Sequence, residues 1–88
     1  MDAFDASSPW RLSSQVSLRD ESFGALAYHH GNRRLVFLKS PELVTLVRRL
    51  GEFDSAHDAI DEVVPSAQHD AYVRALASLE RSEILSGR

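Results

Sequence analysis

The chain of 88 residues is long enough for one small domain, and its hydrophobic content of 43% is typical of a globular protein. Its formal net charge of −3 gives it no general attraction to polyanions. The absence of cysteine excludes disulfides, thiolate metal sites, iron–sulfur ligation and a cysteine nucleophile. No apolar run approaches the length of a membrane span, and the N-terminus lacks the regions of a signal peptide, so we expect a cytoplasmic protein without a membrane partner.

The first residues, 1–8, are polar and acidic with a single phenylalanine, and we expect them to form a flexible N-terminal tail. Residues 9–88 are expected to form a single domain, because no linker, repeat or low-complexity tract divides them. Within this domain, Gln15–Arg19 alternates between polar and apolar residues, with Val16 and Leu18 on the same side. This period of two predicts a strand with one solvated face.

The stretch Phe23–Lys39 is predicted to be a β-hairpin. Two apolar runs, Ala25–Tyr28 and Leu35–Leu38, flank the pair Gly31–Asn32. Glycine before asparagine between strands is typical of a two-residue turn, because the turn requires positive φ and glycine adopts it without steric cost. A turn at this pair sets the register of the strands, which places Tyr28 opposite Leu35, Leu26 opposite Phe37 and His30 opposite Arg33.

Both faces of this hairpin carry apolar side chains, because residues alternate between faces along a strand. One face is expected to carry Leu26, Tyr28, Leu35 and Phe37, and the other Ala25, Ala27, His29, Arg34, Val36 and Leu38. In a small antiparallel sheet the second strand of the hairpin is expected at an edge, and an apolar edge is a template for another strand. Two interpretations remain open: helices cover both faces, or the edge has a binding role.

The period of apolar residues changes after the hairpin and predicts three helices. Ser40–Glu42 is a helix start with serine as N-cap and proline at the first position, and this helix is expected to end at Gly51. A second helix is expected at about Ser55–Val64, because Pro65 follows it. A third is expected at about residues 67–82, with Ser66 as its cap.

The short apolar pair Ile84–Leu85 follows the third predicted helix and is expected to dock on the core. Three strands cannot hide an apolar face alone, so the helices must cover it. The order of the elements therefore predicts an α+β fold that is winged helix-turn-helix-like, a three-stranded antiparallel sheet followed by three helices.

The histidines, serines and glycines form no catalytic or metal-binding motif. His29 and His30 are adjacent on a strand, so their side chains point to opposite faces. His57 and His69 fall on different predicted helices, and no HExxH or i, i+4 histidine pair is present. The sequence also has no GxSxG elbow and no glycine-rich phosphate loop. We therefore expect no enzymatic activity, no catalytic residue, no metal ion and no cofactor.

The order of the elements also raises the hypothesis of a winged-helix DNA-binding regulator. A recognition helix should present arginine and lysine to phosphates. The third predicted helix and its tail are instead slightly acidic, with Arg74 and Arg81 against Asp70, Glu80 and Glu83. The sequence therefore favours no nucleic acid partner, and DNA binding is kept as the alternative.

Peptide recognition is the interpretation that the pattern favours. An extended peptide can add a strand to an edge beside a helix, where main-chain hydrogen bonds supply affinity and side-chain pockets supply specificity. The helix residues have a plainer interpretation as core. Together with the basic residues that flank the edge, the predicted peptide-binding residues are Arg33, Arg34, Leu35, Val36, Phe37, Leu38, Lys39, His69, Tyr72, Val73 and Leu76.

Several strings of residues resemble a known family. They are WRL at Trp10–Leu12, QV at Gln15–Val16, FGAL at Phe23–Leu26, YH at Tyr28–His29, then Gly31, Arg33, Leu35 and FLK at Phe37–Lys39, and YVRALASLERSEIL at Tyr72–Leu85. The chain resembles, over about residues 9–85, the small peptide chaperones of mycofactocin biosynthesis. That family is one of the RiPP recognition elements, like the PqqD-like chaperones of pyrroloquinoline quinone biosynthesis.

The resemblance implies a fold and a function together. It implies a three-stranded sheet followed by three helices, without enzymatic activity. It also implies that the chain binds the leader of a ribosomally made precursor peptide, as a strand added to the third strand and against the third helix. The partner enzyme implied by the resemblance is a radical SAM maturase, which modifies a C-terminal Val–Tyr of the precursor. We expect a monomer or weak dimer.

Overall fold

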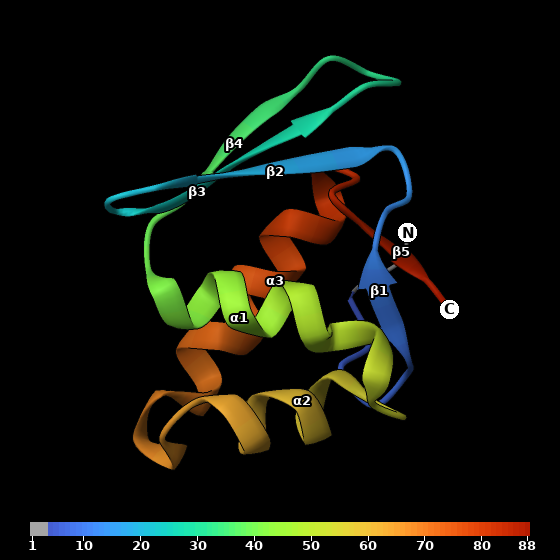
Figure 1. The fold of residues 1–88 in the computed structure, drawn as a ribbon. Helices are drawn as coiled ribbons and strands as arrows, with labels where there is room; N and C mark the ends of the chain where they lie inside the picture. Colours follow the sequence, from blue (N-terminus) through green and yellow to red (C-terminus); the bar gives the residue numbers. More distant parts are fainter. Residues whose placement is uncertain (1–3) are drawn as a thin grey trace.

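The structure is built on an antiparallel sheet whose strands follow one another along the chain (Figure 1). The computed structural model describes residues 4–88. Strands β2 (Val16–Glu21), β3 (Gly24–His29) and β4 (Leu35–Leu38) form this sheet in the order β2-β3-β4. The predicted three-stranded sheet is confirmed, and β2 extends beyond the expected Arg19.

The predicted register of the hairpin is confirmed, but its turn is different. Tyr28 pairs with Leu35, and Leu26 pairs with Phe37. The N–H of Arg33 donates to the carbonyl of His29 at 2.8 Å, which closes a longer loop in place of a two-residue turn. The register is unchanged because both turns have the same centre.

Positive φ in this loop falls on Arg33, at 65°, so the prediction that glycine supplies it is wrong. Gly31 is required by close packing instead. A Cβ on Gly31 would lie 2.4 Å from Oε1 of Gln15 and 2.9 Å from Cε1 of His29. The buried His29 ring accepts hydrogen bonds at Nδ1 from the N–H groups of Gly31 and Asn32, at 3.0 and 3.1 Å. His29 therefore satisfies backbone donors of the loop, which is a structural role.

Three α-helices follow the sheet within the described residues, as the apolar periods predicted: α1 (Pro41–Arg49), α2 (Ala56–Val63) and α3 (His69–Arg81). The caps of the first two are confirmed. The hydroxyl oxygen of Ser40 accepts from the N–H of Leu43, and that of Ser55 from the N–H of Asp58, each at 3.1 Å.

The predicted ends are less accurate where short 3-10 turns intervene. Residues Leu50–Glu52 form the turn η1, so Gly51 lies inside a continued spiral and does not end α1. Ser66–Gln68 form the turn η2, closed by a hydrogen bond from the N–H of Gln68 to the carbonyl of Pro65. The cap of α3 is thus Gln68 without a side-chain bond, and the prediction of Ser66 as the cap is wrong.

A second, two-stranded sheet joins the two ends of the described chain and was not predicted. β1 (Trp10–Leu12) pairs antiparallel with β5 (Leu85–Gly87). Glu83 turns the chain back from α3 with φ of 64°, and the N–H of Ile84 then donates to the carbonyl of Leu79 at 2.9 Å. The expected docking of Ile84–Leu85 is confirmed, because both side chains are buried.

Residues 4–8 pack on the helices, where the sequence analysis expected a flexible tail over residues 1–8; residues 1–3 lie outside the described part. The carbonyls of Ser8 and Ala6 accept the N–H groups of Ala56 and His57, at 3.2 and 2.9 Å. These are first-turn donors of α2, which have no partner inside the helix. Ala6 is buried, and hydrogen bonds from Ser7 and then Ser8 hold the pKa of the Asp5 carboxyl below its ordinary 3.8.

The helices lie on one side of the sheet, and the core lies between the two layers (Figure 1). The sheet contributes the small buried residues Ala25 and Ala27 together with Leu38. The largest fully buried side chains are Leu38, Leu46, Leu50, Ile60, Leu76, Ile84 and Val47. Among residues 4–88, no helix is long and apolar enough to cross a membrane.

Replacing Gly24 by alanine is expected to destabilise the sheet. Gly24 has φ of 150°, and a Cβ there would lie 2.1 Å from the carbonyl oxygen of Leu38, a backbone atom that cannot move alone. We expect the free energy of unfolding, measured in urea, to fall by about 2–3 kcal/mol. Gly87→Ala is the control, because nothing lies within 4 Å of a Cβ at that position. Equal losses in both variants would contradict the packing of Gly24 against β4.

Candidate functional site

Strand β4 forms an open edge of the three-stranded sheet. Among residues 4–88 it pairs with β3 and with no other strand. This confirms the expectation that the second strand of the hairpin lies at an edge. Its sequence, Leu-Val-Phe-Leu, is apolar throughout, and an apolar edge is a site for pairing with another chain.

The hydrogen-bond pattern shows which backbone groups of β4 point outward. The N–H of His29 donates to the carbonyl of Arg34 at 2.9 Å. Hydrogen-bonded and non-hydrogen-bonded pairs alternate along an antiparallel ladder. In this register Val36 and Leu38 therefore bond to β3, whereas Leu35 and Phe37 direct their N–H and C=O groups away from it. A peptide beside β4 would meet these four groups.

The opposite edge of the sheet, at β2, has a different character. Its sequence, Val-Ser-Leu-Arg-Asp-Glu, ends in three charged residues. Arg19 pairs with Glu21 at 2.7 Å, and Asp20 pairs with Arg48 of α1 at 3.0 Å. Charged side chains hinder the addition of a strand. The sheet therefore has one edge suited to pairing and one that is protected.

The structure divides the predicted contact residues of the hairpin into two groups by exposure. Leu35 and Phe37 are 55% and 54% exposed, and Val36 is half-buried. The basic residues Arg33, Arg34 and Lys39 are exposed as well, and none of them makes an ion pair within residues 4–88. Leu38 is fully buried, so its side chain belongs to the core.

The predicted wall on α3 is partly core. Leu76 is fully buried, as the plainer interpretation of the wall residues expected. Tyr72 and Val73 are half-buried and pack on the edge of the core. The Tyr72 hydroxyl lies 3.0 Å from Oγ of Ser40, the residue between β4 and α1. This contact holds the first turns of α3 near the C-terminal end of β4.

His69, the last predicted contact residue, has both ring nitrogens engaged. Its Nδ1 lies 2.9 Å from Oδ1 of Asp61, and its Nε2 lies 2.9 Å from Nδ1 of His57. Sequence reasoning placed the two histidines on separate helices and did not foresee that α2 and α3 bring them together. Even so, neither this cluster nor any other group of three or more His, Asp or Glu side chains in the part of the chain that the structure describes could hold a metal ion.

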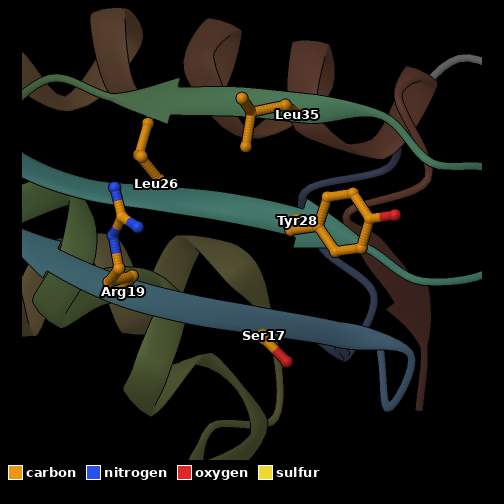
Figure 2. A pocket seen from close by; sticks show the side chains of 5 residues that line it. All are labelled: Ser17, Arg19, Leu26, Tyr28 and Leu35. Carbon is orange, nitrogen blue, oxygen red and sulfur yellow. The ribbon is translucent and has the colours of Figure 1, made fainter.

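The structure shows which of the two predicted faces of the hairpin meets the helices. The alanine face is buried. The other face, which we call the outer face, consists of Phe23, Leu26, Tyr28, Leu35 and Phe37, and no helix formed by residues 4–88 lies over it. A hollow of about 340 Å³ opens on it between Ser17, Arg19, Leu26, Tyr28 and Leu35 (Figure 2). In the sequence, the alternation of residues along both strands of the hairpin indicated this apolar face.

Fold and site together define a small α+β domain that offers an apolar strand edge beside a helix. The chain belongs to the Peptide chaperone MftB family, whose model matches residues 9–86. It is 40% identical over 84 residues to the peptide chaperone MftB of Mycobacterium ulcerans (strain Agy99), covering 94% of this chain and 77% of that protein.

Two further relatives carry the same name. The peptide chaperone MftB of Mycobacterium tuberculosis is 38% identical over 86 residues, covering 97% of this chain and 79% of that protein. The one from Mycolicibacterium smegmatis is 41% identical over 83 residues, covering 93% and 81%. No solved structure matches the chain. A peptide chaperone has a non-catalytic role, in agreement with the expectation of no enzymatic activity, and these matches give no support to a DNA-binding regulator.

Removing the Ser40 hydroxyl is expected to weaken the junction between β4, α1 and α3. Ser40→Ala loses the α1 cap and the contact with Tyr72, so the free energy of unfolding should fall by about 1–2 kcal/mol. Tyr72→Phe loses only the second contact and should cost about 1 kcal/mol or less. In urea unfolding, the double variant should be more stable than the sum of the single losses implies. Strictly additive losses would show that the two hydroxyls do not interact.

Proposed function

We propose that this protein binds the leader of the mycofactocin precursor peptide by adding it as a strand to β4. The observation that carries the proposal is the apolar edge at β4, with the outward N–H and C=O groups of Leu35 and Phe37. Strand addition supplies affinity through the main chain, so it suits a leader that is flexible before it binds. Membership of the peptide chaperone family supports a peptide as the ligand.

Side chains of the added strand alternate between two environments. Those that point toward α3 enter between the half-buried Val36 and the residues Tyr72 and Val73. Those that point the other way lie beside Leu35 and Phe37. The fully buried Leu38 and Leu76 support this groove from the core. The leader should therefore be apolar on both sides where it pairs with β4.

Charge sets the register of the peptide. Arg33 and Arg34 precede β4 and Lys39 follows it, and all three are exposed. We expect these three residues to bind acidic residues of the leader on either side of its paired segment. Such contacts at the rim of an interface act mostly on association rate and specificity. We also include His69, at the start of α3, among the proposed contact residues, although both of its ring nitrogens already contact Asp61 and His57.

The bound leader is then presented to a radical SAM maturase, which acts on the C-terminal part of the same peptide. Ordering a flexible peptide costs several kcal/mol, so we expect a dissociation constant of roughly 0.1–1 μM, about −8 to −10 kcal/mol. The benefit to the reaction is effective concentration, because the captured peptide stays near the enzyme. We place this step in the cytoplasm and expect the protein to act as a monomer or weak dimer.

Proline at position 37 is expected to remove peptide binding. It deletes an outward N–H of β4 without breaking a bond to β3, and proline is tolerated on an edge strand. Loss of main-chain hydrogen bonds and of close approach should weaken binding by roughly 30-fold or more, about 2 kcal/mol. The measurement is a titration of isotope-labelled protein with the precursor peptide, followed by amide NMR. Shifts should concentrate at 34–39 and 69–79 in the wild type and be absent in Phe37→Pro.

Two variants control for other causes. Phe37→Ala removes the same side chain but keeps the N–H, and it should lose only a few-fold in affinity. Asp20→Pro places proline on the opposite edge, where the ladder also directs an N–H outward, and it should bind as the wild type does. Unchanged affinity in Phe37→Pro, or equal losses in the two proline variants, would exclude strand addition at β4.

A further inference from the structure

The outer face is a second exposed apolar surface of the molecule, and the proposed peptide site reaches only its border, at Leu35 and Phe37. Phe23, Tyr28, Leu35 and Phe37 are 36–55% exposed there. The rings of Phe23 and Phe37 lie 5.8 Å apart, which joins the turn before β3 to β4 in one patch. Contiguous apolar surface of this kind on a small protein marks an interaction site.

We propose that the outer face is where the chaperone docks on its maturase, by way of an apolar side chain of the enzyme that is flanked by a carboxylate. This inference rests on the proposed function, because it names the surface that passes the peptide on. It assigns the two open features of the sheet to two different partners. The edge of β4 takes the peptide, and the outer face takes the enzyme.

The hollow on this face specifies the chemistry of its occupant. Its apolar lining consists of Leu26, Tyr28 and Leu35, and Figure 2 shows the Arg19 side chain extending from β2 toward β3. Arg19 donates to Glu21 only through Nε, so its two terminal amino groups have no partner within residues 4–88. A hollow of about 340 Å³ accepts one large apolar side chain. The two terminal amino groups of Arg19 favour a carboxylate beside that side chain.

The size and charge of the outer face argue against a second copy of the chain as its occupant. The four most exposed side chains offer roughly 400 Å² of apolar surface, at about 200 Å² for a whole large side chain. A stable interface buries about 800 Å² on each partner. A second copy would bring another Arg19 to the interface. The nearby carboxylate of Glu21 already pairs with the Arg19 of its own chain. A smaller contact suits an enzyme that must bind and release the chaperone in each cycle.

The outer face is continuous with the peptide site. Leu35 and Phe37 belong to both, because their backbone groups form the edge and their exposed side chains lie on the outer face, as Figure 2 shows for Leu35. A leader strand added beside them therefore contributes its own alternate side chains to the same surface. Docking on this face places the enzyme directly beside the bound peptide.

The test uses two residues of β3, the central strand, whose backbone takes no part in the open edge at β4. Leu26→Thr/Tyr28→Thr removes apolar surface from the hollow and keeps residues that favour a strand. Affinities of wild type and variant are measured by calorimetry, once for the precursor peptide and once for the purified radical SAM maturase. We expect peptide affinity to stay within about twofold and maturase affinity to fall at least tenfold, the loss typical of interface anchors.

A matched pair of arginine variants tests the carboxylate. Arg19→Gln and Arg49→Gln each remove one charge from an arginine whose Nε bonds a nearby glutamate. Only Arg19 lies on the outer face. Arg19→Gln should weaken maturase binding about three- to tenfold and reduce its dependence on salt. Arg49→Gln should do neither.

The outcomes separate the two proposals. Unchanged maturase affinity in the double variant, with the wild type binding peptide normally, would overturn the outer face as docking site and leave the peptide proposal intact. No peptide binding by the wild type would overturn the proposed function itself. A dimer in sedimentation velocity that dissociates in Leu26→Thr/Tyr28→Thr would assign the face to a second copy, and would likewise overturn docking of the enzyme there.

Discussion

The structure depends on the burial of one face of a three-stranded sheet by a single layer of helices. Ala25 and Ala27 carry small side chains on that face, so α1 approaches β3 and β4 closely, and Leu38, Leu46 and Leu76 fill the interior. All three α-helices of residues 4–88 lie on this one side of the sheet, so the described residues leave the other face uncovered. The side chains on the uncovered face and edge then decide what these surfaces can bind.

The choice of side chains differs between the two edges, and this difference is informative. On β2 the sequence Arg19-Asp20-Glu21 places charges along the edge, and Asp20 is tied to Arg48 below it. On β4 four consecutive apolar residues occupy the equivalent position. An exposed apolar edge carries a risk of aggregation that charges would remove at little cost. Its retention on one edge alone is best explained by a ligand that needs it.

Most of the fold could be predicted from local features of the sequence, such as turns and helix caps, because each of these depends on only a few neighbouring residues. The register of the hairpin followed from the centre of its loop, and the caps at Ser40 and Ser55 followed from their hydroxyls. Positive φ was predicted at Gly31 and occurs at Arg33, but this error did not affect the predicted register. The position of β4 at an edge was likewise predicted, because both of its faces are apolar and the antiparallel sheet is small.

What the sequence did not reveal are contacts between distant segments. The pairing of β1 with β5, the packing of residues 4–8 on α2 and the meeting of His57 with His69 all join residues whose partners no local pattern identifies. The exposure of the outer face could not be predicted for another reason. Its apolar residues were assigned to one face correctly, but only the positions of the helices show which face stays open.

The proposed geometry also couples the two binding events. In the proposed complex, a leader strand paired with Leu35 and Phe37 lies at the border of the outer face, so an enzyme docked there contacts protein and peptide together. Contacts made only when both are present couple the two binding events, and the coupling is reciprocal: peptide strengthens docking by the same factor by which docking strengthens peptide binding. A chaperone of this design distinguishes its loaded state from its empty state without changing its own fold. The distinction lies in one added strand, which turns the open edge of a three-stranded sheet into part of the surface that the enzyme recognises.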